Sequence, residues 1–394
     1  MAPSGALMSN YGGREIAFER GDGAWLYDGS GNKYLDSVAG VAVCGLGHAH
    51  PKITKVISEQ AAKLIHTSNL YNVTAQEKLA ETLCQVSGME NAFFANSGAE
   101  ANEAALKLAR LYGHTKNIEV PTIIVMENSF HGRTMATLSA TGNRKVQAGF
   151  EPLVSGFVRA PFNDIGALQN IAKNNSKIVA IMVEPIQGEG GVIIPADDYL
   201  KEIRKLCDER GWLMILDEIQ TGNGRTGKYF AYQHYDLLPD IVTTAKGLGN
   251  GLPISACLAR GIAATLFKPG SHGSTYGGNP LCCATAKVVV DTIVEENLAQ
   301  RASELGERIG GGLKKSLAAL DGIKEIRYKG LMIGIELNDN CTELVNKALH
   351  HGLLINVTAS NVIRLLPALI LTNEQADKIV DILSQVIKSF LSRS

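Results

Sequence analysis

The chain has no hydrophobic run long enough to cross a membrane and no excess of either charge. Its uninterrupted apolar stretches, such as residues 178–183, fall far short of the roughly 20 residues that span a bilayer. Lys and Arg number 38 against 39 Asp and Glu, which gives a net charge of -1. A chain this balanced has no general attraction for nucleic acid or anionic membranes, so we expect neither as a partner.

Cysteine pairs and targeting segments are also lacking. The seven cysteines are an odd number without a CxxC pair, and the adjacent Cys282 and Cys283 cannot easily bridge each other. Residues 1–13 contain no Lys or Arg, and no apolar segment typical of a signal peptide follows. We therefore expect a reduced, cytoplasmic chain. The histidines at 48, 50, 350 and 351 lack companions at metal-ligand spacing, so no metal site is expected.

The length of 394 residues suggests about two domains. Between about 75 and 260, continuous apolar runs alternate with helical patterns, which is typical of a mainly parallel sheet sandwiched by helices. Residues 291–394 mix amphipathic helices with two extended runs, which predicts a smaller α+β domain. Residues 1 to about 50 are predicted to be a strand-rich segment with a hairpin turn at 28–31. The predicted strands are 122–126, 178–183, 212–216, 241–244, 254–259, 332–337 and 362–366, and the predicted later helices are 298–317, about 344–349 and 376–390.

The first candidate for chemistry is the segment 96–103, which follows a short apolar run and opens a helical pattern. Ser97 and Glu100 have the spacing of a capping box. Ser97, Gly98 and Ala99 are small, so their backbone N–H groups can approach an anion at the helix N-terminus. Taken alone, the pattern fits a phosphate site or an ordinary strand-to-helix turn.

The second candidate is Asp217, which follows the apolar run 212–216. A carboxylate at the carboxyl end of a buried strand lies where sites form in such sheets. It needs a cationic partner, because its desolvation is otherwise costly. A protonated ring nitrogen would be such a partner, and a turn-capping role fits equally well.

The third candidate is Lys246, which follows the apolar run 241–244 and enters a loop with Gly247, Gly249 and Gly251. Burial there would lower the pKa of the amine and free it as a nucleophile. The glycines would allow a bulky planar group to approach the backbone. A structural lysine is the alternative.

Together, a phosphate cradle, a strand-end aspartate and a lysine at a glycine turn are what pyridoxal phosphate (PLP) requires. The lysine forms a Schiff base with the cofactor, and the aspartate keeps the pyridine nitrogen protonated. The three candidates therefore predict a PLP enzyme.

Longer motifs resemble those of the class III aminotransferases, which have the PLP-transferase fold of type I. They lie at 46–48, 96–105, 129–134, 183–189, 216–222, 245–249 and 272–280, and the resemblance runs from about residue 15 to the end. The segments 149–154, 352–358 and 361–367 are similar to the acetylornithine branch of the family. The fold implied is a PLP-binding domain over 51–290 and a small domain built from 1–50 and 291–394.

The resemblance also implies roles for individual residues. Lys246 would be the Schiff-base lysine and the proton carrier, and Asp217 would pair with the ring nitrogen. For the rest of the cofactor it implies Ser97, Gly98 and Ala99 at the phosphate, Phe130 stacked on the ring, and Gln220 near the phenolic oxygen. Thr275, with Ser274, would reach the phosphate or substrate across a dimer interface, so a homodimer would be the catalytic unit.

Substrate recognition requires cations, because both half-reactions handle carboxylates. By resemblance, Arg133 would bind the α-carboxylate of N-acetylornithine, and Arg364 that of glutamate or 2-oxoglutarate. Glu184 would neutralise Arg364 when the amine donor is bound. The function implied is transfer of the δ-amino group of acetylornithine to 2-oxoglutarate, a step of arginine biosynthesis.

Three alternatives stay open at this point. The amine donor could be ornithine, succinylornithine, succinyldiaminopimelate or 4-aminobutyrate. The same scaffold could carry an aminomutase or racemase, which would transfer no amino group to 2-oxoglutarate. A non-catalytic binding protein is disfavoured by the intact Lys246 and Asp217.

Overall fold

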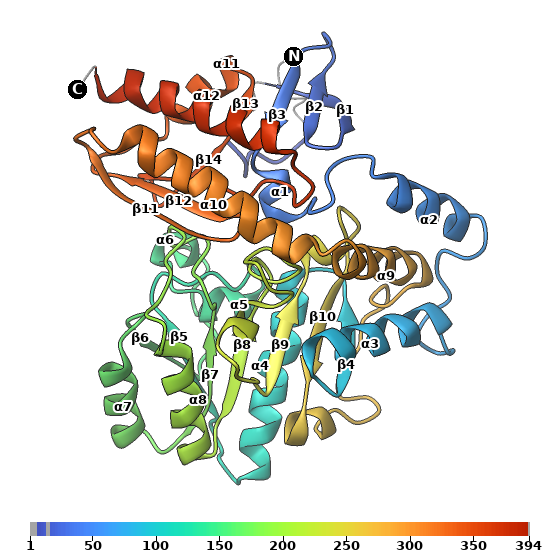
Figure 1. Cartoon of the computed structure of the whole chain (residues 1–394). Helices are drawn as coiled ribbons and strands as arrows, with labels where there is room; N and C mark the ends of the chain where they lie inside the picture. The colour runs from blue at the N-terminus through green and yellow to red at the C-terminus, as the bar shows by residue number, and fades with distance from the viewer. Residues whose placement is uncertain (1–5, 13–15, 393–394) are drawn as a thin grey trace.

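The computed structural model describes residues 6–12 and 16–392, and its centre is a seven-stranded sheet with helices on both faces (Figure 1). The strand order is β4-β10-β9-β8-β7-β5-β6, and β10 alone runs antiparallel to its neighbours. The strands are β4 (Asn91–Ala95), β5 (Thr122–Met126), β6 (Phe157–Ala160), β7 (Ile178–Val183), β8 (Leu213–Asp217), β9 (Ile241–Thr244) and β10 (Ser255–Ala259). The mainly parallel sheet predicted from the apolar runs is confirmed.

The continuous apolar strands are explained by burial on both faces. Ile123 and Ile215 pack with apolar residues of α4 (Gly98–Thr115) in one core cluster. Ile124 and Leu216, the next residues along the same strands, pack in a second cluster with α8 (Tyr199–Arg210). Since successive side chains of a strand point to opposite faces, α4 and α8 cover opposite sides of the sheet.

The remaining helices of this part of the chain surround the sheet and its edges. They are α2 (Pro51–Ala61), α3 (Thr74–Ser87), α5 (Met135–Ala140), α6 (Arg144–Gln147), α7 (Ile165–Asn174) and α9 (Pro280–Glu295), with short 3₁₀ turns η1 (Ala231–His234), η2 (Lys246–Leu248) and η3 (Gly261–Thr265). The predicted domain boundary at residue 290 falls inside α9, the helix that leads toward the C-terminal part of the chain.

A second sheet brings the two ends of the chain together. Strands β1 (Phe18–Asp22), β2 (Trp25–Asp28) and β3 (Lys33–Asp36) form antiparallel pairs, and the predicted hairpin turn lies between β2 and β3. The short β13 (Leu353–Leu354) adds to β3 in parallel. This pairing supports the prediction that the N-terminal segment joins the C-terminal part, and α1 (Ala39–Ala42) then leads to the central sheet.

A third, antiparallel sheet has the order β11-β12-β15-β14 and packs with one long helix, which in turn packs against a second one (Figure 1). Its elements are β11 (Ile323–Lys329), β12 (Met332–Leu337), β14 (Asn356–Thr358), β15 (Val362–Leu365), α10 (Leu298–Leu317), α11 (Leu344–His350) and α12 (Asn373–Leu391). Gly310, in the middle of α10, lies so close to β11 that a Cβ atom would be 2.2 Å from the ring of Tyr328. The glycine that lowers helix propensity therefore permits this packing. Thr372 and Gln375 form a capping box at the N-terminus of α12.

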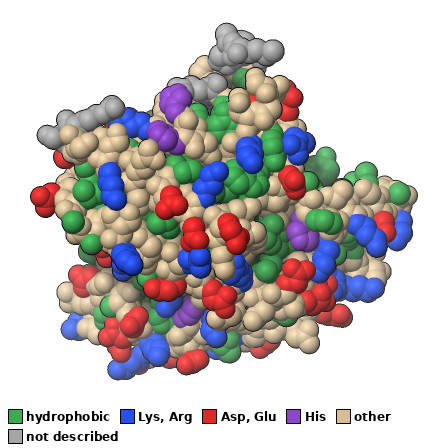
Figure 2. Space-filling model, turned by 45° about the horizontal axis from the view of Figure 1, so that its top comes forward, with side chains coloured by type: hydrophobic (Ala, Val, Ile, Leu, Met, Phe, Trp, Pro, Cys, Tyr) green, Lys and Arg blue, Asp and Glu red, His purple; other side chains and the backbone are tan. Residues whose placement is uncertain are grey.

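No helix within residues 6–12 and 16–392 has the length and apolar content of a membrane span. Figure 2 shows basic and acidic side chains interspersed over the face that it presents, as the balanced composition leads one to expect.

Candidate active site

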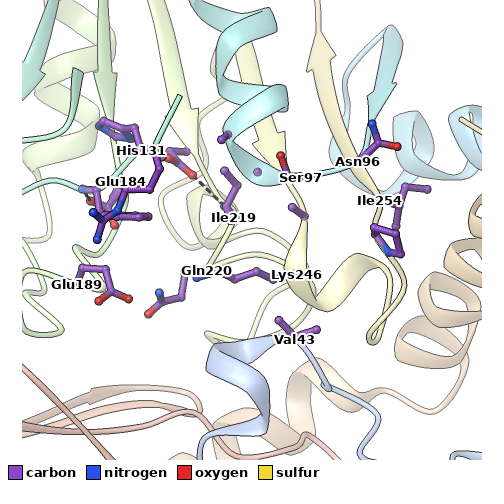
Figure 3. Close-up of a pocket in the computed structure, with 18 of the residues that line it drawn as sticks. Val43, Asn96, Ser97, His131, Glu184, Glu189, Ile219, Gln220, Lys246 and Ile254 are labelled. Atoms are coloured by element: carbon purple, nitrogen blue, oxygen red, sulfur yellow. Dashed lines mark hydrogen bonds and ion pairs between the residues drawn. The ribbon is translucent and has the colours of Figure 1, made fainter. Parts of the chain in front are cut away.

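A cavity of about 440 Å³ opens at the carboxyl ends of the parallel strands (Figure 3). Such an edge is where parallel sheets build their sites. The lining comes from Val43, residues 96–99 and 130–133, Glu184, Glu189, Asp217, Ile219, Gln220, and residues 245, 246 and 251–254. The three candidates predicted from the sequence are therefore brought together in one cavity.

Lys246 is held in a costly backbone conformation inside this cavity. It begins η2 just after β9 and has a φ of 45°. A non-glycine residue in the left-handed region costs of order 1–3 kcal/mol and is retained where the surroundings enforce it. Burial lowers the pKa of its amine, the charge of Arg364 lowers it further, and the carboxylates of Glu189 and Asp217 oppose the shift. A lowered pKa favours the uncharged, nucleophilic amine.

The glycines after Lys246 are required mainly by the packing of the turn itself, and less by access to the cavity. A Cβ atom on Gly249 would lie 2.1 Å from the carbonyl oxygen of Leu252, and one on Gly247 would lie 3.1 Å from Cβ of Asn223. Gly251, with a φ of 112°, lines the cavity. The prediction that all three make room for a ligand is wrong for Gly247 and Gly249, which make room for the turn itself.

Asp217 is the last residue of β8 and is 4% exposed. Its Oδ2 accepts hydrogen bonds from Nδ2 of Asn102 at 2.8 Å and from Nδ1 of His131 at 2.7 Å. Its Oδ1 accepts one from the backbone N–H of Ile219 at 3.1 Å. These bonds fix the orientation of a carboxylate that still lines the cavity, so it can serve a further cationic partner.

Asn102 and His131 are the parts of this arrangement that the sequence did not reveal. Asn102 is fully buried on α4 and accepts a hydrogen bond from the hydroxyl of Thr243, on β9, at 2.7 Å. Burial alone would lower the pKa of His131, but the hydrogen bond and charge of Asp217 raise it above its usual value. The available signal for Asn102 was its place beside the small residues Ala101, Ala104 and Ala105, a segment in which Glu103 is the other polar residue.

The segment 96–99 forms the N-terminus of α4, as predicted. Ser97 is the N-cap, and its Oγ accepts the N–H of Glu100 at 3.3 Å. The carboxylate of Glu100 binds the backbone and side chain of Asn96 instead of closing the capping box on Ser97. The N–H groups of a first helical turn have no partners within the helix, so those of Gly98 and Ala99 remain for an anion in the cavity.

Phe130 and Glu184 are joined across the cavity edge. Glu184 follows β7, and its carboxylate accepts the N–H of Phe130 at 2.9 Å and that of Gly188 at 3.1 Å. Burial raises the pKa of Glu184 to about 7, although the nearby charge of His131 opposes this. Glu184 thus orients the loop that carries Phe130 and the loop that begins at Gly188.

Arg364 pairs with Glu189 in this structure, whereas Glu184, the partner predicted for it when the amine donor is bound, accepts backbone N–H groups. Arg364 is 2% exposed, and its Nη1 lies 2.6 Å from Oε1 of Glu189 and 3.3 Å from Oε1 of Gln220. Oδ1 of Asn356 accepts hydrogen bonds from the same guanidinium at 2.7 and 3.1 Å. Glu184 is engaged by backbone N–H groups, whereas Glu189, five residues on, reaches the arginine. Glu189 and Gln220 lie side by side along the cavity wall near Lys246 (Figure 3).

The other predicted residues divide into two groups. Arg133 is exposed, lines the cavity and lies over the ring of Phe130 with 5.7 Å between its guanidinium carbon and the ring centre. Ser274 and Thr275 do not line this cavity. Oγ of Ser274 accepts hydrogen bonds from Asn96 at 3.2 Å and from the N–H of Gly277 at 2.9 Å, and Thr275 is exposed.

Comparison with known proteins places this cavity in a family. Residues 8–387 match the family described as aminotransferase class-III. The chain belongs to the class III aminotransferases. It is 54% identical over 385 residues to the acetylornithine aminotransferase of Nitrosomonas europaea, covering 98% of both chains. It is 46% identical over 381 residues to the acetylornithine aminotransferase of Methanothermobacter thermautotrophicus, covering 97% of this chain and 96% of the relative.

Solved structures agree with this assignment. The ornithine aminotransferase of Toxoplasma gondii superimposes with a TM-score of 0.95 at 34% identity, over 99% of this chain and 94% of that one. The acetylornithine aminotransferase of Elizabethkingia anophelis gives a TM-score of 0.88 at 38% identity, over 97% and 96%. The aminotransferase therefore has the fold type I architecture expected from its motifs, and the family's cofactor is PLP.

The cavity of this aminotransferase fits that cofactor. It offers an amine with a lowered pKa at Lys246, an oriented carboxylate at Asp217, and a helix N-terminus at Gly98 and Ala99. When bound, PLP supplies the electron sink that makes amino transfer feasible. The protein's part is to bind, orient and exchange protons.

Proposed function

We propose that this aminotransferase transfers the δ-amino group of N-acetylornithine to 2-oxoglutarate, as a step of arginine biosynthesis. The observation that carries the proposal is one cavity that contains a buried amine and has one guanidinium group in its lining and a second bonded to that lining. Arg133 lines the cavity beside Phe130, and Arg364 stands behind Glu189 and Gln220. The names of the relatives at 46–54% identity support the same amine donor.

In this proposal Lys246 binds the cofactor covalently and carries the proton between the substrate carbon and the cofactor carbon. Asp217, oriented by His131 and Asn102, keeps the ring nitrogen protonated. For the remaining contacts we assign Ser97, Gly98 and Ala99 to the phosphate, Phe130 to the ring face and Gln220 to the phenolic oxygen.

The two arginines would share the work of recognition. Arg133 would bind the α-carboxylate of acetylornithine, so that the far amino group would be offered to the cofactor held by Lys246. Arg364 would bind the α-carboxylate of glutamate or 2-oxoglutarate. The carboxylate that neutralises Arg364 in the absence of that substrate is Glu189, which is 36% exposed and so accessible to an exchanging anion.

The catalytic unit in this proposal is a homodimer in which Ser274 and Thr275 serve the partner's cavity. Thr275 is exposed and is not among the residues that line the cavity of its own chain. Next to it lies a group of exposed apolar side chains, and the ring of Tyr276 is 5.5 Å from that of His66. The exposed members are Leu64, Ile65, Leu70, Tyr71 and Tyr276. Such a surface suits contact with a second copy.

Complementation tests the dimer. Lys246→Ala and Thr275→Asp should each be nearly inactive, the latter because its charge repels a phosphate. Co-expressed with different tags, they should form mixed dimers with one intact cavity and regain activity. Mixed dimers without recovered activity would contradict a shared site.

The proposed location is the cytoplasm, where arginine precursors and a reducing environment occur together. All seven cysteines are free thiols, as expected for a reducing compartment. Fractionation of cells that express the native chain tests this location.

The main test is a panel of amine donors offered with 2-oxoglutarate and ranked by kcat/KM. Acetylornithine should rank above ornithine, succinylornithine, succinyldiaminopimelate and 4-aminobutyrate. Preference for another donor would replace the proposed substrate. Absence of glutamate formation with every donor would instead favour an aminomutase or racemase.

A further inference from the structure

The loop 188–192 carries Glu189. Its base is held by residues that follow β7 of the central sheet, and its tip is held by the third sheet. At its base, Glu184 binds the N–H of Gly188, and Gln187 forms an isolated bridge with Ile193. At its tip, Thr358 on β14 donates its hydroxyl to the carbonyl oxygen of Glu189 at 2.5 Å. The position of the Glu189 carboxylate therefore depends on how the loop tip lies on the third sheet.

Four residues form one row across that sheet beneath the loop tip. Arg327 on β11 pairs with Gly334 on β12, Gly334 pairs with Arg364 on β15, and Arg364 pairs with Asn356 on β14. Directly paired residues present their side chains on the same face. The two arginines therefore stand on either side of a glycine, on the face that meets the loop.

Gly334 allows the loop to lie close to this row of residues, because it has no side chain. A Cβ atom at this position would lie 2.9 Å from Cβ of Val192 and 3.4 Å from the carbonyl oxygen of Gly191. The loop tip consequently rests on the bare backbone between the two arginines. Any side chain at position 334 would push it away.

Both arginines bind the loop. Arg364 holds the Glu189 carboxylate at 2.6 Å. Arg327 donates from Nη2 to the carbonyl oxygen of Gly191 at 2.6 Å and from Nε to that of Val192 at 2.8 Å. Its remaining nitrogen, Nη1, meets Glu336 at 2.6 Å and Glu325 at 2.7 Å. Arg327 is 7% exposed and does not line the cavity, so its bonds to the loop are not explained by substrate binding.

We propose that Arg327 is a positioning residue for the Glu189–Arg364 pair and thereby sets the preference between the two substrates. The inference rests on the function proposed above. Arg327 holds the loop so that Glu189 occupies Arg364 until a dicarboxylate replaces it. Because Glu189 and the substrate carboxylate compete for the same guanidinium, a loosened loop makes Glu189 easier to displace.

The test uses Arg327→Met in the PLP-loaded enzyme and measures two quantities. The first is the affinity for glutarate, a dicarboxylate that cannot react, by calorimetry. The second is the ratio of kcat/KM for acetylornithine to that for glutamate in the separate half-reactions. We expect glutarate to bind about tenfold more tightly and the ratio to fall about tenfold, a size common for residues of one hydrogen-bond network.

Two further variants separate positioning from general damage. Arg308→Met removes an exposed arginine that pairs with Asp377 on the same part of the chain and should leave both quantities unchanged. In a Glu189→Gln background, Arg327→Met should have no further effect on glutarate affinity, because it acts through Glu189. Additive effects in the double variant would overturn the proposal, as would equal losses for both substrates.

Gly334→Ala provides a second, charge-neutral way to displace the loop tip and should change glutarate affinity in the same direction. Wild-type glutarate affinity in both Arg327→Met and Gly334→Ala would overturn the proposal. The measurement of glutarate affinity does not depend on turnover. If acetylornithine proves not to be a substrate, glutarate binding still decides the role of Arg327, whereas the donor panel decides the proposed function.

Discussion

The cavity's two sides are built on different principles. On the side of the central sheet, Asp217 ends β8, Lys246 follows β9, and the partners Asn102 and His131 are fully buried in the same layer. On the side of the third sheet, Arg364 and Glu189 come from separate parts of the chain and meet as an ion pair. The first side is fixed by strand ends, and the second depends on an ion pair that, in the proposed function, a substrate carboxylate would exchange.

The difference between the two sides of the cavity suits two tasks, which are to act on the reacting group and to accept two substrates of different charge. Charges that act on the reacting group work best when they are oriented in advance and shielded from water. A pocket that accepts two substrates of different charge needs a cation whose counter-ion can leave. Arg364 is 2% exposed and Glu189 is 36% exposed, so in the proposed function the buried cation would stay in place while its more accessible carboxylate partner moves.

The largest effect should come from removing the amine on the rigid side. Lys246→Ala should lower kcat by at least about 10²–10⁴-fold, the usual contribution of a positioned acid–base group. It should also abolish trapping of the cofactor by borohydride. Lys201→Ala, on the exposed surface of α8, is the matched control. Trapping that persists in Lys246→Ala would show that another lysine binds the cofactor.

Asp217→Asn tests the oriented carboxylate while keeping its shape. The variant can still hydrogen-bond but carries no charge to stabilise a protonated ring nitrogen, so kcat should fall about 10²–10³-fold, as for other preorganised electrostatic groups. The half-reaction with glutamate, followed by the cofactor's absorbance, gives the rate. Asp291→Asn, in a half-exposed pair with Lys287, should leave it unchanged. An undiminished rate in Asp217→Asn would remove the proposed role.

The sequence predicts the residues on the central-sheet side of the cavity well and those on the third-sheet side poorly. β5, β7 and β9 begin and end at the predicted residues, because a strand buried on both faces leaves a continuous apolar run. Asp217 and Lys246 were found for the same reason, since each follows such a run. Their position is a property of local sequence.

Glu189 and Asn102 were missed because their roles arise from tertiary contacts. Glu184 and Glu189 lie five residues apart in the motif 183–189, and nothing in their spacing shows which one reaches β15. Backbone N–H groups of Phe130 and Gly188 capture Glu184, and this leaves Glu189 for Arg364. The N-terminal hairpin was predicted from its turn, whereas its pairing with β13 depends on residues more than 300 positions away.

Arg133→Ala should show how far recognition of the amine donor is independent of the ion pair between Arg364 and Glu189. Losing one charge-assisted contact to a carboxylate costs about 1.5–3 kcal/mol, so KM for acetylornithine should rise about 10–100-fold. KM for glutamate should change much less, because Arg364 is the residue proposed to bind that substrate. Arg144→Ala removes a nearby exposed arginine that does not line the cavity and is the control. Equal rises for both substrates would contradict the division of labour.

The smallest predicted effect is on the pH dependence of stability, and it concerns Glu184, which connects the two sides of the cavity. Burial raises its pKa from 4.5 to about 7. Between these values the folded protein holds a proton that the unfolded chain has lost, so its contribution to stability decreases as pH rises from about 4.5 to about 7. Glu184→Gln cannot titrate and should lose this pH dependence.

Urea unfolding of the cofactor-free protein at about pH 5 and about pH 8 measures the difference between wild type and Glu184→Gln. Relative to the variant, the wild type should lose about 1–3 kcal/mol over this range. Glu218, whose pKa burial also raises to about 7, is present in both proteins and cancels. Glu209→Gln, at an exposed position of α8, should follow the wild type. A pH-independent difference between wild type and Glu184→Gln would mean that Glu184 is ionised throughout, held by its backbone N–H partners and by His131.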